Sequence, residues 1–106
     1  WDLHVRWVSL LEEEFFNQGD KEKHTGLSVS FLMDRQKPGA SATQVGFFNF
    51  VVLPLFKVLH RAVPAVQPML DTLMANYESW KQHEEQKAAK CNDETTAPME
   101  VDSDQE

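Results

Sequence analysis

Residues 41–56 read Ser-Ala-Thr-Gln-Val-Gly-Phe-Phe-Asn-Phe-Val-Val-Leu-Pro-Leu-Phe and form the longest apolar run in the chain. One uncharged polar residue, Gln44, stands at its entrance. Burying an amide without partners costs about 1–3 kcal/mol. Phe47 follows one helical turn later, on the same side of a helix. An amide beside an aromatic ring can hold a flat heterocycle, by hydrogen bonds at the edge and stacking on the plane. The alternative is that Gln44 only caps a core helix.

The segments before this run predict one helix and one loop. Residues 1–18 repeat apolar side chains at the i, i+3, i+4 spacing, and Gly19 is a plausible C-terminal stop. Residues 27–40 alternate apolar and polar side chains like a strand, but the chain offers no partner strand. We therefore expect residues 27–40 to form an ordered, partly buried loop.

Two further helices are expected, so the predicted fold class is all-α. Ser41 or Thr43 can cap the central helix, and Pro54 should kink or split it. The helix should end before Pro64, because the residue before a proline avoids the helical region. A last helix is predicted from about Pro68 to Gln86.

The net charge of −7 is concentrated at the C-terminal end. Residues 91–106 hold six acidic side chains and no lysine or arginine, which is typical of disorder. Residues 1–90 hold eleven acidic and ten basic side chains. Nucleic-acid surfaces need clustered lysine and arginine, so we expect no nucleic-acid partner. We divide the chain into a folded part, residues 1–87, and a disordered acidic tail, residues 88–106.

Other signals point to a cytoplasmic protein. Cys91 is the single cysteine, which fits a reducing compartment. The chain begins with Trp1 and has no recognisable signal peptide, and we expect it to be a fragment of a larger protein. The run Val45–Leu59 is interrupted by polar residues and Pro54, so we expect it to be too short and too broken to span a bilayer.

The residues themselves supply no catalytic machinery. The four histidines form neither an H-x₃-H nor an H-E-x-x-H pair, so we predict no metal site from this chain alone. The run Glu12-Glu13-Glu14 is typical of a solvated helix face. There is no Gly-rich phosphate loop and no Gly-x-Ser-x-Gly motif. The prediction is a chain that binds a ligand and has no catalytic residues of its own.

Three blocks resemble a known family: Glu-Glu-Phe-Phe-Asn-Gln-Gly-Asp-Lys-Glu (13–22), Leu-Met-Asp-Arg (32–35) and Thr-Gln-Val-Gly-Phe-Phe-Asn-Phe (43–50). In order and spacing they resemble the C-terminal third of the catalytic domain of class I 3′,5′-cyclic nucleotide phosphodiesterases. The opening, Trp1 to Trp7, resembles the calmodulin-stimulated branch. The resemblance runs to about residue 80, with departures at Val8 and Asn49. It implies the C-terminal part of a larger all-helical catalytic domain.

The resemblance also implies a binding site for the purine of cAMP or cGMP. Gln44 matches the glutamine that hydrogen-bonds the base edge, Phe47 matches the phenylalanine that stacks on one face, and Leu11 matches the aliphatic residue on the other face. Phe15 and Leu32 match further pocket positions, and Trp7 would pack behind the pocket. His4 matches a position that contacts the glutamine, and a histidine there goes with acceptance of both nucleotides. The alternative is that His4 lies on a helix surface.

The catalytic groups of such enzymes lie upstream of residue 1. The resemblance implies Zn²⁺ and Mg²⁺, held by histidines and aspartates outside this chain, and hydrolysis of the cyclic phosphate to a 5′-monophosphate. We therefore expect the complete protein to be a hydrolase and the fragment alone to be inactive. A different possibility is a small helical interaction module that carries an acidic tail.

Overall fold

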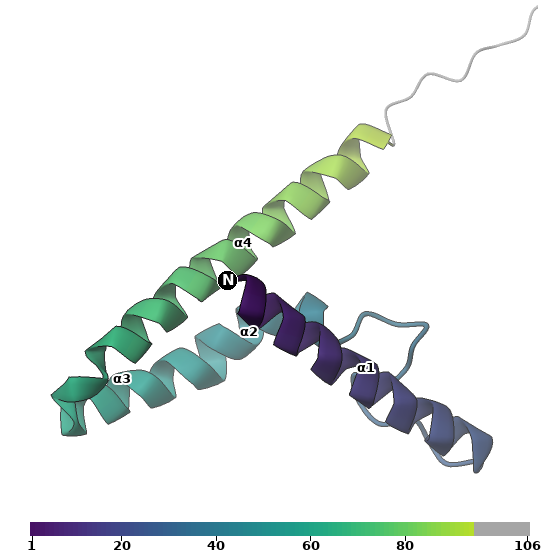
Figure 1. Ribbon diagram of the computed structural model, residues 1–106. Coiled ribbons are helices and arrows are strands. Elements are labelled where there is room, and N and C mark those ends of the chain that lie inside the picture. Colours follow the sequence, from purple (N-terminus) through teal and green to yellow (C-terminus); the bar gives the residue numbers. More distant parts are fainter. Residues whose placement is uncertain (95–106) are drawn as a thin grey trace, which may run out of the picture.

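The computed structural model describes residues 1–94 and is all-α over that range, as predicted (Figure 1). Four α-helices are joined by two 3₁₀ turns and one π-helical turn. In chain order the elements are α1 (Asp2–His24), η1 (Ala40–Thr43, 3₁₀), α2 (Gln44–Phe47), η2 (Phe48–Val52, π), α3 (Leu53–Ala62), η3 (Pro64–Val66, 3₁₀) and α4 (Gln67–Glu94).

The core lies where the start of α1, the central run and α4 meet. In Figure 1, α3 and the first half of α4 form a helical hairpin, and the N-terminal end of α1 lies against α4. Val8, Phe48 and Trp80 are buried together there. Partly buried apolar side chains surround them: Val5, Val45, Val52, Leu73 and Tyr77. One helix face from each of three segments therefore builds a single small core.

The prediction that Gly19 stops α1 is wrong. The helix continues to His24, and Gly19 is buried inside it. A Cβ at this position would collide with the carbonyl group of Met33, so the glycine serves close packing of the following loop. The helix ends instead around Gly26, whose φ is 75°. The Gly26 and Leu27 amides donate to the carbonyls of Lys23 and Glu22, the hydrogen-bond pattern of a Schellman motif.

The segment between α1 and η1 is an ordered loop, as predicted. The Glu22 carboxylate accepts hydrogen bonds from the Ser30 amide, at 2.7 Å, and from the Ser30 hydroxyl, at 2.8 Å. Lys23 pairs with Asp34 at 3.0 Å. Arg35 reaches back to α1, where its guanidinium pairs with two carboxylates and an amide oxygen, those of Glu13, Asp20 and Asn17. The loop is thus fastened along the charged side of α1.

The central run stays helical through Pro54, with a π turn at residues 48–52 just before it. Pro54 has no amide hydrogen, and its ring would clash with the carbonyl four residues earlier in an α-helix. A wider π turn relieves that conflict. The expected disturbance at Pro54 is therefore a local widening of the helix.

The expectation that the central run is too short to cross a membrane is wrong on length. Residues Ala40–Ala62 make a helical segment of 23 residues that is long and apolar enough to span a bilayer. Length and composition alone do not distinguish such a segment from a helix of a soluble protein. The expected absence of a membrane span stays a prediction.

The boundary of the expected tail also changes. Helix α4 runs to Glu94, so residues 88–94 are helical, whereas the sequence predicts that they belong to the tail. The rest of the predicted acidic tail, residues 95–106, lies outside the described residues.

Candidate functional site

Gln44 is the only polar side chain in the described chain that is buried, with 7% of its surface exposed. It opens α2, and its Nε2 donates a 3.0 Å hydrogen bond to the carbonyl of Ala40. Every buried side-chain nitrogen or oxygen among the described residues has a hydrogen-bond partner, and none of these residues pairs with Gln44 Oε1. The oxygen of the amide therefore keeps some contact with solvent and has no partner among the described residues, while its nitrogen is held by Ala40.

The two adjacent phenylalanines of the central run face opposite environments. Phe48 is buried in the core and stacks on Tyr77, with ring centroids 6.2 Å apart. Phe47 is 50% exposed. Its ring lies one turn from Gln44 and is available to a ligand or to another part of the protein. The predicted amide–aromatic pair thus comes from one helical turn, with the amide buried and the ring half exposed.

His4 packs in the core at the crossing of α1 and α4. Its Nε2 accepts a 2.9 Å hydrogen bond from the indole Nε1 of Trp80, and its ring meets Phe48 edge to face. Burial, and then the positive N-terminus of the chain, lower the pKa of His4 below its usual value. These contacts do not fit a histidine on a helix surface. No hydrogen bond in the described structure joins His4 to Gln44, so the predicted contact between them stays a prediction.

The remaining predicted pocket residues come from α1 and the loop. Leu11 is 48% exposed, and Phe15 is half-buried one turn further along the same face of α1. Leu32 is half-buried and has a φ of 64°, an unusual conformation for a branched side chain. Trp7, which we expect to pack behind the pocket, is 65% exposed, so residues 1–94 do not supply its packing partner.

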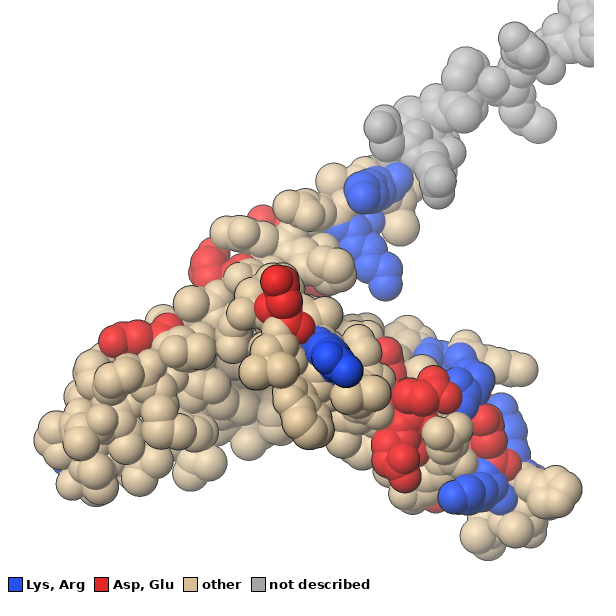
Figure 2. Space-filling view, in the orientation of Figure 1, with Lys and Arg blue, Asp and Glu red and all other residues tan. Residues whose placement is uncertain are grey.

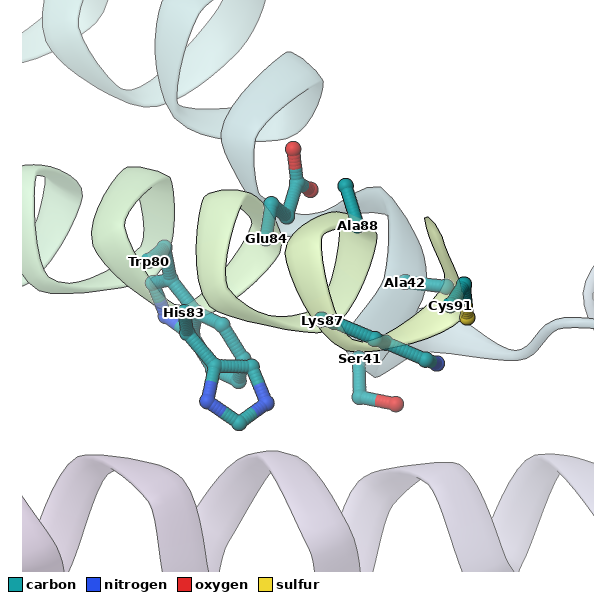
Figure 3. A pocket seen from close by; sticks show the side chains of 8 residues that line it. All are labelled: Ser41, Ala42, Trp80, His83, Glu84, Lys87, Ala88 and Cys91. Atoms are coloured by element: carbon teal, nitrogen blue, oxygen red, sulfur yellow. The ribbon is translucent and has the colours of Figure 1, made fainter. Parts of the chain in front are cut away.

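Two cavities lie near these elements, and neither is lined by Gln44 or Phe47. One, of about 370 Å³, lies between η1 and the second half of α4 (Figure 3). Trp80 and Ser41 are among its lining side chains, together with polar groups of α4. The other, of about 480 Å³, is formed within the loop and is lined in part by Leu32. Neither of these two cavities therefore brings the predicted residues together.

Sequence reasoning missed two residues that bear on the site. Trp80 lies within the predicted last helix and has no predicted role, although its indole N–H donates a hydrogen bond to His4. Glu12 was assigned to a solvated run, although its carboxylate bonds the segment just before Gln44. Neither pairing leaves a local signal, because the partners are 76 and 29 positions away.

Comparison with known proteins identifies the family. The family model of 3′,5′-cyclic nucleotide phosphodiesterases matches residues 1–73. The chain belongs to this family. It is 47% identical over 72 residues to the dual specificity calcium/calmodulin-dependent 3′,5′-cyclic nucleotide phosphodiesterase 1B of Mus musculus. The matched residues are 67% of this chain and 14% of that relative. The same identity and coverage of the chain hold for the 1C enzyme of Homo sapiens, of which the match covers 10%.

The name of a third relative specifies one nucleotide. The 3′,5′-cyclic-AMP phosphodiesterase isoform F of Drosophila melanogaster is 45% identical over 75 residues, covering 70% of the chain and 11% of that protein. The expected resemblance to the calmodulin-stimulated branch is confirmed by the 1B and 1C relatives. The chain spans about a seventh or less of the length of the relatives named here.

The departures from the phosphodiesterase pattern do not disturb the predicted pair. Val8 is buried in the core, where an apolar side chain fits, and Asn49 is exposed. Within residues 1–94, no group of three or more histidine, cysteine, aspartate or glutamate side chains is placed to hold a metal ion. The described residues therefore do not fit the metal site that the family implies.

Proposed function

We propose that this phosphodiesterase chain forms the base-binding part of an enzyme that hydrolyses cAMP, cGMP or both to the 5′-monophosphate. Gln44 would pair with the purine edge, and Phe47 and Leu11 would enclose the two faces of the ring. Phe15 and Leu32 would line the pocket, and His4 would influence which base is accepted. The observation that carries the proposal is the buried amide of Gln44, whose oxygen has no partner among the described residues, one turn from a half-exposed aromatic ring.

The proposal assigns this chain recognition and not bond cleavage. Because the described residues do not form a metal site, we place the Zn²⁺ and Mg²⁺ ligands and the general acid in the part of the catalytic domain that this chain does not span. The chain alone would then be inactive, and the rest of the domain would be its principal partner. We further propose a cytoplasmic location, consistent with the single cysteine.

The test replaces Gln44 in the full polypeptide that carries these residues. We expect Gln44→Ala to lower kcat/KM about 10- to 100-fold, since a lost buried hydrogen bond is worth about 1–3 kcal/mol. Gln82→Ala, at an exposed glutamine of α4, is the matched control and should leave kcat/KM unchanged. Unaltered kcat/KM for both cyclic nucleotides in the Gln44 variant would refute the proposal.

A second pair of variants tests the stacking role of the aromatic ring. Phe47→Ala should raise KM for the nucleotides, because base–aromatic stacking contributes about 1–3 kcal/mol per base. Phe50→Ala removes a ring that is more exposed and lies three positions further along the same helical segment. Equal effects of the two substitutions would show that Phe47 does not stack on the base.

A further inference from the structure

The peptide that joins Ala40 to Ser41 is held from both sides. Its N–H, on Ser41, donates a 3.0 Å hydrogen bond to Oε1 of Glu12, and the Ser41 hydroxyl donates to the same oxygen at 2.7 Å. Its C=O, on Ala40, accepts from Gln44 Nε2 at 3.0 Å and from the Thr43 hydroxyl at 2.9 Å. A trans peptide is planar, with N–H and C=O pointing in opposite directions. The carboxylate of Glu12 therefore sets the direction of the carbonyl that holds Gln44.

The structure leaves room for this carboxylate. A Cβ on Gly39 would collide with Glu12 Oε1 and with the ring of Phe16, so any other residue here would have to displace these side chains. The carboxylates of Glu13 and Glu14 make no hydrogen bond with the Ala40–Ser41 peptide. Glu13 pairs with Arg35, and Glu14 makes no hydrogen bond or ion pair with another described residue. Glu12 is thus distinguished from the rest of the acidic run by its position and its partners.

The bond to Ala40 determines how the amide of Gln44 faces. A backbone carbonyl can only accept, so the nitrogen of the amide must point to it. The oxygen of Gln44, an acceptor, and its second N–H, a donor, then have fixed positions relative to a ligand. Adenine carries an amino donor at the ring position where guanine carries a carbonyl acceptor. An amide fixed in one orientation matches the donor and acceptor order of only one of these bases.

We propose that Glu12 is a positioning residue that fixes the orientation of the Gln44 amide by holding the Ala40–Ser41 peptide. The inference rests on the proposed function of Gln44 as the residue that reads the purine. Removing the carboxylate lets the peptide rotate, frees the amide to turn, and weakens discrimination between cAMP and cGMP. The bond between Gln44 and Ala40 itself can be tested without any enzyme activity.

The first test observes the amide directly by nuclear magnetic resonance, in the full polypeptide labelled with ¹⁵N in its glutamine side chains. Loss of a signal in Gln44→Ala assigns the Gln44 amide. We expect Glu12→Met to increase the hydrogen exchange of this amide about tenfold or more, because the bond to Ala40 opens. Glu14→Met is the matched control on the same helix and should leave it unchanged. Glu12→Gln keeps an acceptor oxygen and should restore most of the protection.

The second test measures specificity. Glu12→Met should move the ratio of kcat/KM for the two cyclic nucleotides toward one by about threefold or more, while Glu14→Met keeps the parent ratio. Glu12→Gln and Ser41→Ala should both retain the parent ratio and amide protection. If Glu12→Met does not fold, Glu12→Ala takes its place, and it should shift the ratio and the amide exchange in the same direction. Circular dichroism verifies that each variant folds.

The outcomes separate this inference from the function on which it rests. Gln44 exchange that is the same in Glu12→Met and Glu14→Met overturns the inference. An unchanged nucleotide ratio in Glu12→Met also overturns it, provided that Gln44→Ala has lost activity. A loss of amide protection in Glu12→Gln and Ser41→Ala would overturn it as well. If Gln44→Ala keeps full activity, the proposed function fails, and the claim about specificity fails with it. The exchange measurement still decides whether Glu12 positions the amide.

Discussion

Trp80 donates the hydrogen of its indole Nε1 to Nε2 of His4 across 2.9 Å and so joins two residues 76 positions apart. Because Nε2 accepts, the neutral imidazole must carry its proton on Nδ1. Protonation of Nε2 would remove the acceptor and break the bond. The beginning of α1 and the middle of α4 are thus joined by a contact that requires a neutral histidine.

This relationship predicts a stability that depends on pH. The pKa of His4 is lowered in the folded chain from 6.5 by burial and by the positive N-terminus. Below pH 6.5 the unfolded chain therefore binds more protons at this residue than the folded chain, so stability must decrease as pH falls. We expect urea unfolding followed by circular dichroism to show this decrease between pH 7.5 and about 5. His4→Gln should flatten the slope, whereas His24→Gln at an exposed position should keep it.

A second prediction uses one substitution at two glycines. Gly19→Ala should lower the free energy of unfolding by about 1–3 kcal/mol, because the new methyl group meets the Met33 carbonyl and displaces the loop. Gly46→Ala has open space and should raise the free energy of unfolding by about 0.5–1 kcal/mol through helix propensity. Chemical denaturation of the two variants compares the values. Equal effects would mean that Gly19 does not pack against the loop.

The third prediction concerns Leu32, which holds a φ of 64°. Such a conformation costs on the order of 1–3 kcal/mol for a bulky side chain, and glycine adopts it without strain. We expect Leu32→Gly to lose little stability or to gain some, although it removes a half-buried apolar side chain. Phe31→Gly, at the neighbouring exposed residue without a positive φ, should decrease stability. If Leu32→Gly is the more destabilising of the two, its side-chain contacts outweigh the strain.

Local sequence patterns predicted the helices, whereas the roles of Gly19 and Glu12 depend on tertiary contacts that these patterns do not show. The helices predicted over residues 1–18 and from about Pro68 to Gln86 contain Val8 and Trp80, and both residues lie in the core. The prediction for Gly19 is wrong because the sequence does not distinguish a glycine that ends a helix from a glycine that lets a neighbouring backbone pack closely. The three glutamates of α1 are equally indistinguishable in sequence, yet Glu12 alone reaches Ser41. The pair Gln44 and Phe47 could be proposed because one helical turn contains both.

The fourth prediction concerns the apolar surface that the described chain leaves uncovered. Figure 2 shows few charged side chains over α3 and the adjoining part of α4, whereas they gather over the far part of α1. Leu55 and Val58 of α3 and Leu3 and Trp7 of α1 are all exposed. Apolar surface of this kind marks an interface or an aggregation site. A chain that forms one part of a larger catalytic domain should therefore associate with itself when it is isolated.

Light scattering combined with circular dichroism on the isolated chain checks this expectation. We expect the apparent mass to rise with concentration, and Leu55→Glu to reduce the rise because a charge on the uncovered face opposes association. Lys57→Glu changes a polar position of the same helix and should have a smaller effect. Joining the chain to the upstream part of a phosphodiesterase catalytic domain should abolish the association, since the apolar faces are then covered. A helical interaction module with an acidic tail would instead be monodisperse on its own and would unfold cooperatively, and that result would favour the binding-module interpretation over the enzyme fragment.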